Sequence, residues 1–180
     1  MALAINIRSD DSSAERIEAL WDEVAAFESQ PSMRGLGYQP HFTFAIYDAP
    51  EITAKTAWET MLRAVGGEGP LQVAFKRIRW FAGPPLVLWA EPEFDETLVR
   101  WHASISAAID PALCRLHYRP ENWRPHCTLG TQIADAKRDD AIAFAQSFSG
   151  SISVLFDVVD CVSFPPVSVI AEQGLPVRTP

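Results

Sequence analysis

Hydrophobic positions along the chain recur with two different spacings, and each spacing predicts a different element. Within residues 2–8, Leu3, Ile5 and Ile7 alternate with small or polar residues, which predicts a strand. Within residues 14–27 the hydrophobic positions recur every three or four residues behind polar capping residues, which predicts a helix. The same reasoning predicts further helices at 53–65, 95–109 and 134–148, and further strands at 41–47, 71–75 (continuing toward Trp80), 86–90, 126–132, 152–156, 161–164 and 167–171.

The predicted elements repeat along the chain. Residues 40–45 read PHFTFA and residues 125–130 read PHCTLG, and each segment is followed by a predicted helix. After those helices in the sequence, two further pairs of segments have matching residue types: 71–75 with 152–156, and 84–86 with 165–167. We therefore interpret the chain as a single domain, 1–180, made of two pseudo-repeated lobes at approximately 1–83 and 84–180.

Length and charge limit the possible partners. A chain of 180 residues with 48% hydrophobic and 21% charged residues is long and apolar enough to fold around one core. Its 15 basic and 23 acidic residues give a net charge of −8, which argues against binding long duplex nucleic acid, because that affinity depends on neutralising phosphates. A small pocket for a single phosphate remains compatible with this charge.

Other composition signals point to a soluble cytoplasmic protein. The three cysteines form an odd, low count, which favours free thiols in a reducing compartment. No run of residues is long and apolar enough to span a membrane, and the first residues lack the basic and apolar regions of a signal peptide. Neither glycine-rich nucleotide-binding motif, G-x-x-x-x-G-K-[ST] nor G-x-G-x-x-G, is present, so we expect no cofactor.

The repeated segment carries chemistry. Residues two apart on a strand project from the same face, so His41 shares a face with Thr43, and His126 with Thr128. Each imidazole then lies ~7 Å along the strand from a hydroxyl, a spacing into which a phosphate fits. If the two copies pack about a pseudo-two-fold axis, the two pairs face each other across a groove.

Two histidines facing a phosphodiester can move both protons of a displacement reaction. A neutral imidazole takes a proton from the attacking water or hydroxyl, and a protonated imidazole gives one to the leaving oxygen. The threonine hydroxyls can donate to the non-bridging oxygens, and this arrangement requires no metal. A third His-x-Ser segment begins at His102 within a predicted helix, where residues two apart do not share a face, and we set it aside.

Three alternatives stand beside this hypothesis. Cys114, His117, His126 and Cys127 have ligand types found in zinc sites, but adjacent strand residues point to opposite faces. The same geometry argues against Cys127 as a nucleophile activated by its neighbour. A non-catalytic phosphate- or nucleotide-binding module would use the same groove, although the retention of both His-Thr pairs favours catalysis.

The motifs HFTF and HCTL resemble the 2H phosphoesterase superfamily, to which the 2′-5′ RNA ligase and cyclic phosphodiesterase proteins belong. The stretch from RWF at 79–81 to PLVLW at 85–89 also looks like the central segment of that family, so the resemblance covers essentially the whole chain. It implies an α+β, bilobal fold in which two antiparallel sheets flank a central groove, with the helices outside. It also implies metal-independent cleavage of 2′,3′-cyclic nucleotides or related phosphodiesters, or 2′-5′ joining of RNA, with His41, Thr43, His126 and Thr128 in the four catalytic positions.

The acidic net charge favours a small substrate, such as a nucleotide or a short RNA end with a cyclic phosphate, acted on by a monomer. Four further residues are candidates for binding it. Arg124 can hold a phosphate with two hydrogen bonds, Tyr38 and Phe81 can stack on a base, and Arg34 can gate the groove from its loop. The sequence leaves open which histidine is the acid and which is the base.

Overall fold

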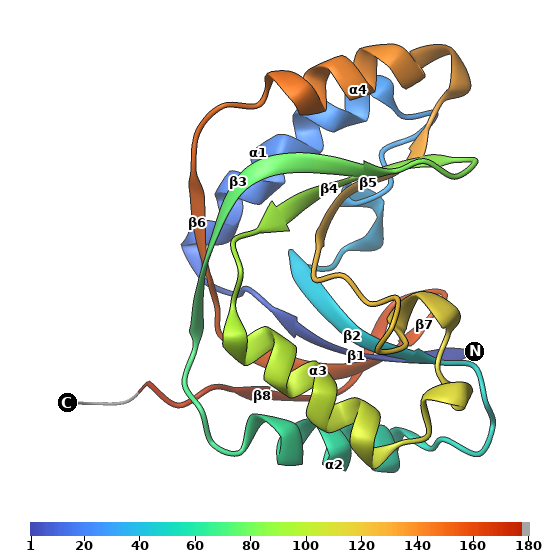
Figure 1. The fold of residues 1–180 in the computed structure, drawn as a ribbon, viewed down its shortest axis with the longest axis vertical. Helices are drawn as coiled ribbons and strands as arrows, with labels where there is room; N and C mark the ends of the chain where they lie inside the picture. Colours follow the sequence, from blue (N-terminus) through green and yellow to red (C-terminus); the bar gives the residue numbers. More distant parts are fainter. Residues whose placement is uncertain (178–180) are drawn as a thin grey trace.

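The structure, a computed structural model that describes residues 1–177, has an α+β architecture with two four-stranded antiparallel sheets and four α-helices (Figure 1). Sheet A has the order β2 (His41–Tyr47), β1 (Ala2–Arg8), β7 (Val158–Phe164), β8 (Ser168–Gly174). Sheet B has the order β5 (Cys127–Ile133), β4 (Leu86–Pro92), β3 (Leu71–Phe81), β6 (Ile152–Phe156). The expected fold class is confirmed.

The helices cover the outer faces of the two sheets (Figure 1). Helices α2 (Ala54–Val65) and α3 (Glu96–Ala108) pack on sheet A, and α1 (Glu15–Val24) and α4 (Arg138–Ser147) pack on sheet B. Side chains fix where two of them begin: the Thr53 hydroxyl accepts the backbone N–H of Thr56, and the Asp95 carboxylate accepts those of the first turn of α3. No helix within residues 1–177 is long and apolar enough to cross a membrane.

Each sheet takes strands from both halves of the sequence. Sheet A combines the first two strands with the last two, whereas sheet B contains the four strands between them. Residues 83 and 84, where the sequence repeat divides, lie in the turn between β3 and β4, inside sheet B. The two strand orders correspond, with β2 and β5 each at one edge of a sheet beside β1 and β4.

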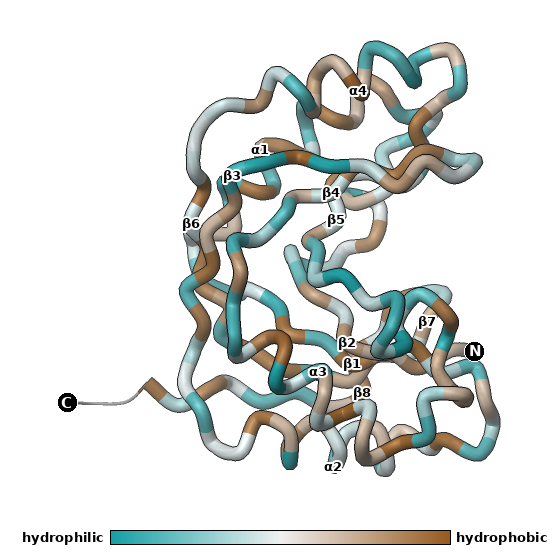
Figure 2. The backbone as a smooth tube through the Cα atoms, in the orientation of Figure 1, coloured by the Kyte–Doolittle hydropathy of each residue, from teal (hydrophilic) through white to brown (hydrophobic). Residues whose placement is uncertain are grey.

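Alternation along β2 and β5 separates the core from the opposite face. Phe42, Phe44, Cys127 and Leu129 have no exposed surface, and Phe42 packs against two phenylalanine rings with centroids 4.7 and 5.9 Å away. Burial of such rings is the main favourable contribution to folding. Figure 2 shows hydrophobic and hydrophilic stretches alternating along the strands and helices. The other face of β2 therefore carries His41 and Thr43, and the other face of β5 carries Thr128, with His126 immediately before that strand.

Candidate functional site

The four residues of the two His-Thr pairs line one cavity of about 220 Å³ between the sheets. His41 and Thr43 come from β2, Thr128 comes from β5, and His126 immediately precedes β5. All four side chains are half-buried. Tyr38, another predicted site residue, lines the same cavity and packs edge-on against His41, with ring centroids 4.8 Å apart. The structure thus brings together five residues that lie as much as 90 positions apart in the sequence.

Both histidines are held in the same tautomer. The Nδ1 atom of His41 lies 2.8 Å from the carbonyl oxygen of Gln39, and that of His126 lies 2.7 Å from the carbonyl oxygen of Arg124. A carbonyl oxygen can only accept, so the proton of each neutral ring is on Nδ1. The Nε2 atom of each ring is then an acceptor, ready to take a proton from a molecule in the cavity.

Burial lowers the pKa of His41 below the usual value for histidine, and the hydrogen bond to the Gln39 carbonyl opposes that shift. Burial is also the main cause that lowers the pKa of His126, and the nearby His41 and His117 lower it further. A partly dehydrated imidazole disfavours its charged form. Both rings therefore remain neutral to a lower pH than a histidine in water.

Behind Thr43 lies a buried polar network in sheet A. The Thr43 hydroxyl donates to Asn6 Oδ1 over 2.8 Å, and Asn6 Nδ2 donates to Asp160 over 2.9 Å and to the Tyr38 hydroxyl over 3.2 Å. The Tyr38 hydroxyl and the Arg8 Nε in turn donate to Asp160, over 2.5 and 3.0 Å. Burial raises the pKa of Asp160, while these donors oppose the shift. The network fixes the first His-Thr pair from behind.

Aromatic rings surround the second pair. Phe81 and Trp89 pack edge-on against His126, with centroids 5.3 and 5.9 Å from it, and they stack on each other at 5.1 Å. The Thr128 hydroxyl has no protein hydrogen-bond partner within residues 1–177, although its backbone carbonyl accepts from Trp21 Nε1 over 3.0 Å. The hydroxyl is therefore free to bond to a ligand.

A second cavity of about 480 Å³ shares His126 and Thr128 with the first. Two other predicted site residues line it: Phe81, which is 38% exposed, and Arg124, which is exposed. Part of the wall comes from the loop before β5, where Arg115, His117 and Asn122 lie, and the turn between β3 and β4 contributes Gly83 and Pro85. This cavity therefore combines apolar side chains with the cationic groups of Arg115 and Arg124.

The loop before β5 is held by the histidine that the sequence analysis set aside. His102, on α3, is buried, stacks on Trp123 with centroids 4.0 Å apart, and lies 2.9 Å through Nε2 from the Tyr118 carbonyl. Trp123 Nε1 donates to the Thr43 carbonyl over 3.0 Å. His102 and Trp123 therefore anchor the loop to α3 and to β2, and neither lines the two cavities.

Arg34 does not reach the cavity of the His-Thr pairs. Its guanidinium donates to Asp22 over 2.9 Å and to Glu18 over 2.6 Å, and it lies over the ring of Trp21. These contacts hold its loop against α1. The gating role expected for Arg34 has no contact to support it, because two carboxylates on the neighbouring helix attract the side chain away from the groove.

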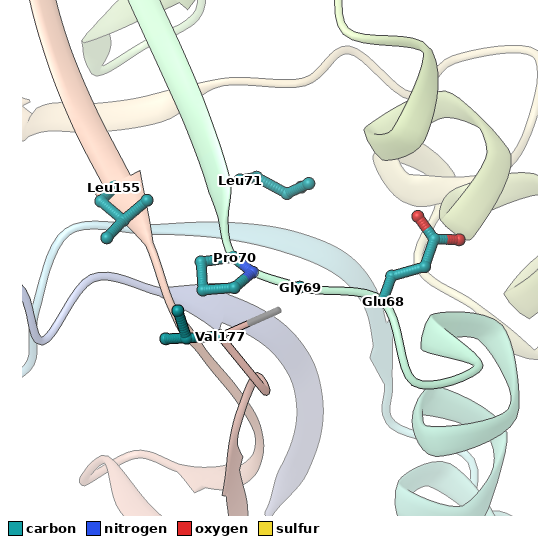
Figure 3. A pocket seen from close by; sticks show the side chains of 6 residues that line it. All are labelled: Glu68, Gly69, Pro70, Leu71, Leu155 and Val177. Atoms are coloured by element: carbon teal, nitrogen blue, oxygen red, sulfur yellow. The ribbon is translucent and has the colours of Figure 1, made fainter. Parts of the chain in front are cut away.

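A hollow of about 700 Å³, larger than either of these two cavities, lies elsewhere (Figure 3). It is lined by Glu68, Gly69, Pro70, Leu71, Leu155 and Val177. Its single titratable side chain, Glu68, forms an ion pair with Arg100 over 2.6 Å. Nothing in it can move a proton at neutral pH or bind an anion, so size alone does not identify the site.

The cysteines lie in the core. Cys127 has no exposed surface, and burial raises its pKa to about 12, opposed by the backbone N–H of His41. A thiol in that state is a poor nucleophile. Burial also raises the pKa of Cys114, and within residues 1–177 no three His, Cys, Asp or Glu side chains are grouped so that they could hold a metal ion.

Sequence reasoning missed Asn6, Asp160 and Arg8. Asn6 and Asp160 interrupt otherwise apolar strands, and a polar residue on such a strand needs a buried partner. The sequence shows that each residue needs a partner, but it does not show which one, because Asn6 and Asp160 are 154 positions apart. The predicted strand begins at residue 161, whereas β7 begins at Val158, so Asp160 falls outside the prediction.

Comparison with known proteins agrees with the fold. A family model of the 2′-5′ RNA ligase superfamily matches residues 9–164. The structure of TT0787 from Thermus thermophilus superposes with a TM-score of 0.68 at 17% identity, covering 97% of this chain and 98% of that one. No curated protein matches the sequence.

Two solved structures of Escherichia coli LigT show the same fold. LigT complexed with 3′-AMP has a TM-score of 0.64 at 15% identity, covering 96% of this chain and 97% of that one. LigT complexed with NADP⁺ has a TM-score of 0.61 at 14% identity, covering 96% of both chains. The family match, which extends over most of the sequence, confirms the resemblance carried by the two motifs: this chain belongs to the 2′-5′ RNA ligase superfamily of phosphoesterases.

Proposed function

We propose that the protein hydrolyses a cyclic phosphate or a phosphodiester of a small nucleotide or RNA end, with His41 and His126 as the general base and the general acid. The reaction needs no metal ion in this proposal, because two imidazoles supply both proton transfers. A 2′,3′-cyclic nucleotide is the substrate class that we favour, and a 2′-5′ linkage is a further one. The superfamily membership supports the reaction type.

One observation carries the proposal. Two imidazoles that line one cavity of about 220 Å³ both have Nδ1 tied to a backbone carbonyl, which leaves both Nε2 atoms to act on the same bound group. A histidine with a purely structural role would not require a second histidine, with the same tautomer, on the other side of the cavity. Two such groups, one neutral and one protonated, are what acid–base cleavage of a phosphodiester requires.

The surroundings of the cavity support a nucleotide as the substrate. The cavity of about 480 Å³ next to the histidines offers the ring of Phe81 for stacking and the guanidinium of Arg124 for a phosphate. LigT, which has the same fold, has been solved in complex with 3′-AMP and with NADP⁺. The net charge of −8 argues against a long positive track for nucleic acid, which favours a short substrate.

The test is turnover of a set of 2′,3′-cyclic nucleotides by the wild type and by His126→Ala, each with a chelator present. We expect hydrolysis by the wild type that is unaffected by the chelator and falls by about 10²–10⁴-fold in the variant. Binding of nucleotides without turnover of any cyclic nucleotide or 2′-5′ dinucleotide by the folded wild type would overturn the proposal and leave a binding module. Loss of turnover with the chelator alone would contradict the metal-free mechanism.

A further inference from the structure

The hydroxyls of Thr43 and Thr128 differ in where their protons go. Thr43 donates its single proton to Asn6 Oδ1 over 2.8 Å, whereas the Thr128 hydroxyl has no protein partner within residues 1–177. The residue that pairs with Thr43 across sheet A is Asn6, and the residue that pairs with Thr128 across sheet B is Trp89, which offers no acceptor. The two threonines thus present different chemistry to the cavity.

The direction of the Thr43 proton is set from behind by Asp160. Asn6 is 1% exposed, and its Nδ2 donates to both the Asp160 carboxylate and the Tyr38 hydroxyl. Turning the amide around would place Oδ1 against that carboxylate, so Oδ1 must face Thr43 as an acceptor. If Thr43 turned its proton toward a ligand, Asn6 Oδ1 would be left buried without a donor, which is unfavourable.

We infer that Thr43 presents lone pairs to the cavity and therefore accepts a hydrogen bond from the nucleophile, while Thr128 donates to a phosphoryl oxygen. Asn6 and Asp160 are positioning residues that impose this difference. The inference rests on the proposed function, and it removes the ambiguity between the histidines: His41, on the strand of Thr43, is the base, and His126 is the acid.

The resulting step balances in protons and bonds. A water molecule donates one hydrogen to Thr43 Oγ1 and the other to His41 Nε2. His41 Nε2 takes that proton as the bond from the water oxygen to phosphorus forms. The bond from phosphorus to the ring oxygen of the cyclic phosphate breaks, and that ribose oxygen takes the proton from His126 Nε2. The product is a phosphate monoester, and exchange with solvent restores the two rings.

The experiment compares Thr43→Val with Thr128→Val, using Thr43→Ser and Thr128→Ser as matched controls that keep each hydroxyl. Binding of inorganic phosphate is measured by calorimetry, kcat and KM are measured with a 2′,3′-cyclic nucleotide, and thermal unfolding checks each fold. We expect Thr128→Val to weaken phosphate binding by about tenfold or more, since it loses a hydrogen bond to a charged group. Thr43→Val should keep the phosphate affinity and lose about tenfold or more in kcat.

Asn6→Ala tests the positioning directly. It frees the Thr43 proton, so we expect kcat to fall as in Thr43→Val while phosphate binding stays the same or tightens. If this variant does not fold, the threonine pair decides the question alone. Equal losses of phosphate affinity in Thr43→Val and Thr128→Val would overturn the inference and leave the proposed function standing. A folded wild type that neither binds phosphate nor cleaves any of the substrates would overturn both.

Discussion

The two sheets present the same pair of side chains in opposite surroundings. In sheet A, the His41–Thr43 pair lies in front of a buried network that includes the charged Asp160. At sheet B, the His126–Thr128 pair lies beside the aromatic rings of Phe81 and Trp89. The ion pair nearby in this sheet, between Arg79 on β3 and Glu91 on β4, is at the surface. A repeated motif with repeated backbone geometry therefore does not give two equivalent chemical groups. The neighbours across each sheet, rather than the motif itself, decide what each pair can do.

Ion pairs at corresponding places in the two sheets illustrate the same contrast with reversed charges. Arg8 on β1 pairs with Asp160 on β7 over 3.0 Å, and Glu91 on β4 pairs with Arg79 on β3 over 3.1 Å. The first pair is buried, with side chains 6% and 0% exposed, and the second is open to solvent, with the Arg79 and Glu91 side chains 46% and 33% exposed. In sheet A the ion pair at this position supports the site from behind, whereas in sheet B the corresponding ion pair lies on the surface.

The largest expected effect separates the two histidines. With a 2′-deoxynucleoside 3′-(4-nitrophenyl) phosphate diester, which has no 2′-hydroxyl to attack the phosphorus, water is the nucleophile and the leaving group departs without needing a proton. If His126 is the acid, His126→Ala should cleave this diester nearly as fast as the wild type, while losing about 10²–10⁴-fold with a cyclic nucleotide. His41→Ala should lose activity toward both substrates, because neither reaction then has a base. The rates are measured by release of nitrophenolate and by chromatography of the nucleotide product.

The reverse pattern, with the 4-nitrophenyl diester rescuing His41→Ala alone, would exchange the two roles. Loss of both substrates in both variants would mean that His126 also contributes to binding or charge stabilisation. Thermal unfolding of each variant serves as the control, since both rings are hydrogen-bonded to the backbone and their loss can loosen the fold.

The two ion pairs should differ in their contribution to stability. Asp160→Ala leaves the buried guanidinium of Arg8 without its innermost partner, which costs about 3–5 kcal/mol of the free energy of unfolding. Glu91→Ala, the matched change in sheet B, should cost only about 0–1 kcal/mol because that pair is in solvent. Urea unfolding of the two variants and the wild type gives both values. Similar losses in both would show that the buried network does not support the fold in the way we describe.

A close approach of α1 to sheet B provides a smaller contrast. A Cβ built at Gly130 would lie 2.6 Å from Val24 Cγ1 and 2.9 Å from Glu28 Oε1, a carboxylate oxygen that accepts the backbone N–H groups of the two residues after Gly130. Gly130→Ala should therefore cost about 1–3 kcal/mol through overpacking. At the corresponding position in β2 the chain has Ala45, and Ala45→Gly should cost about 0.5–1 kcal/mol. Unfolding in urea distinguishes them, and a neutral Gly130→Ala would contradict the close packing.

The fold could be predicted from the sequence because its signals are local. Alternation in β1 and helical spacing in α1 each involve residues a few positions apart, and both elements lie where the pattern placed them. The His-Thr pairs could be found because the same short motif occurs twice. The interleaving of β7 and β8 with β1 and β2 was beyond this reasoning, because strand pairing depends on contacts between the two ends of the chain.

The support of the site was harder to predict than the site. Asn6, Tyr38 and Asp160 meet in space from three distant segments, and no spacing rule connects them. Arg34 shows a different difficulty: the sequence places this arginine in a loop near the first motif, where we expected it to gate the groove, but Glu18 and Asp22 on the neighbouring helix bind its side chain. Charge competition of this kind is decided by geometry that only the folded chain supplies.

The smallest expected effect is on pH dependence, where the two histidines can again be told apart. A base must be neutral, so a lowered pKa lets it work at lower pH; an acid must be protonated, so a lowered pKa removes its active form earlier as the pH rises. Burial lowers the pKa of both rings, and both limbs of the kcat/KM profile therefore shift downward, placing the optimum below about 6.5. An anionic substrate stabilises a protonated ring, so the kcat optimum should lie higher.

His117 allows the limbs to be assigned, because its charge lowers the pKa of His126 and is not among the causes that shift the pKa of His41. His117→Gln should raise the pKa of His126, because it removes one of the charges that lower it. If His126 is the acid, the alkaline limb of kcat/KM moves to higher pH and the acidic limb stays in place. If His126 is the base, the acidic limb moves instead. Because His117 also lines the larger cavity, the comparison uses the position of the limbs rather than the height of the profile.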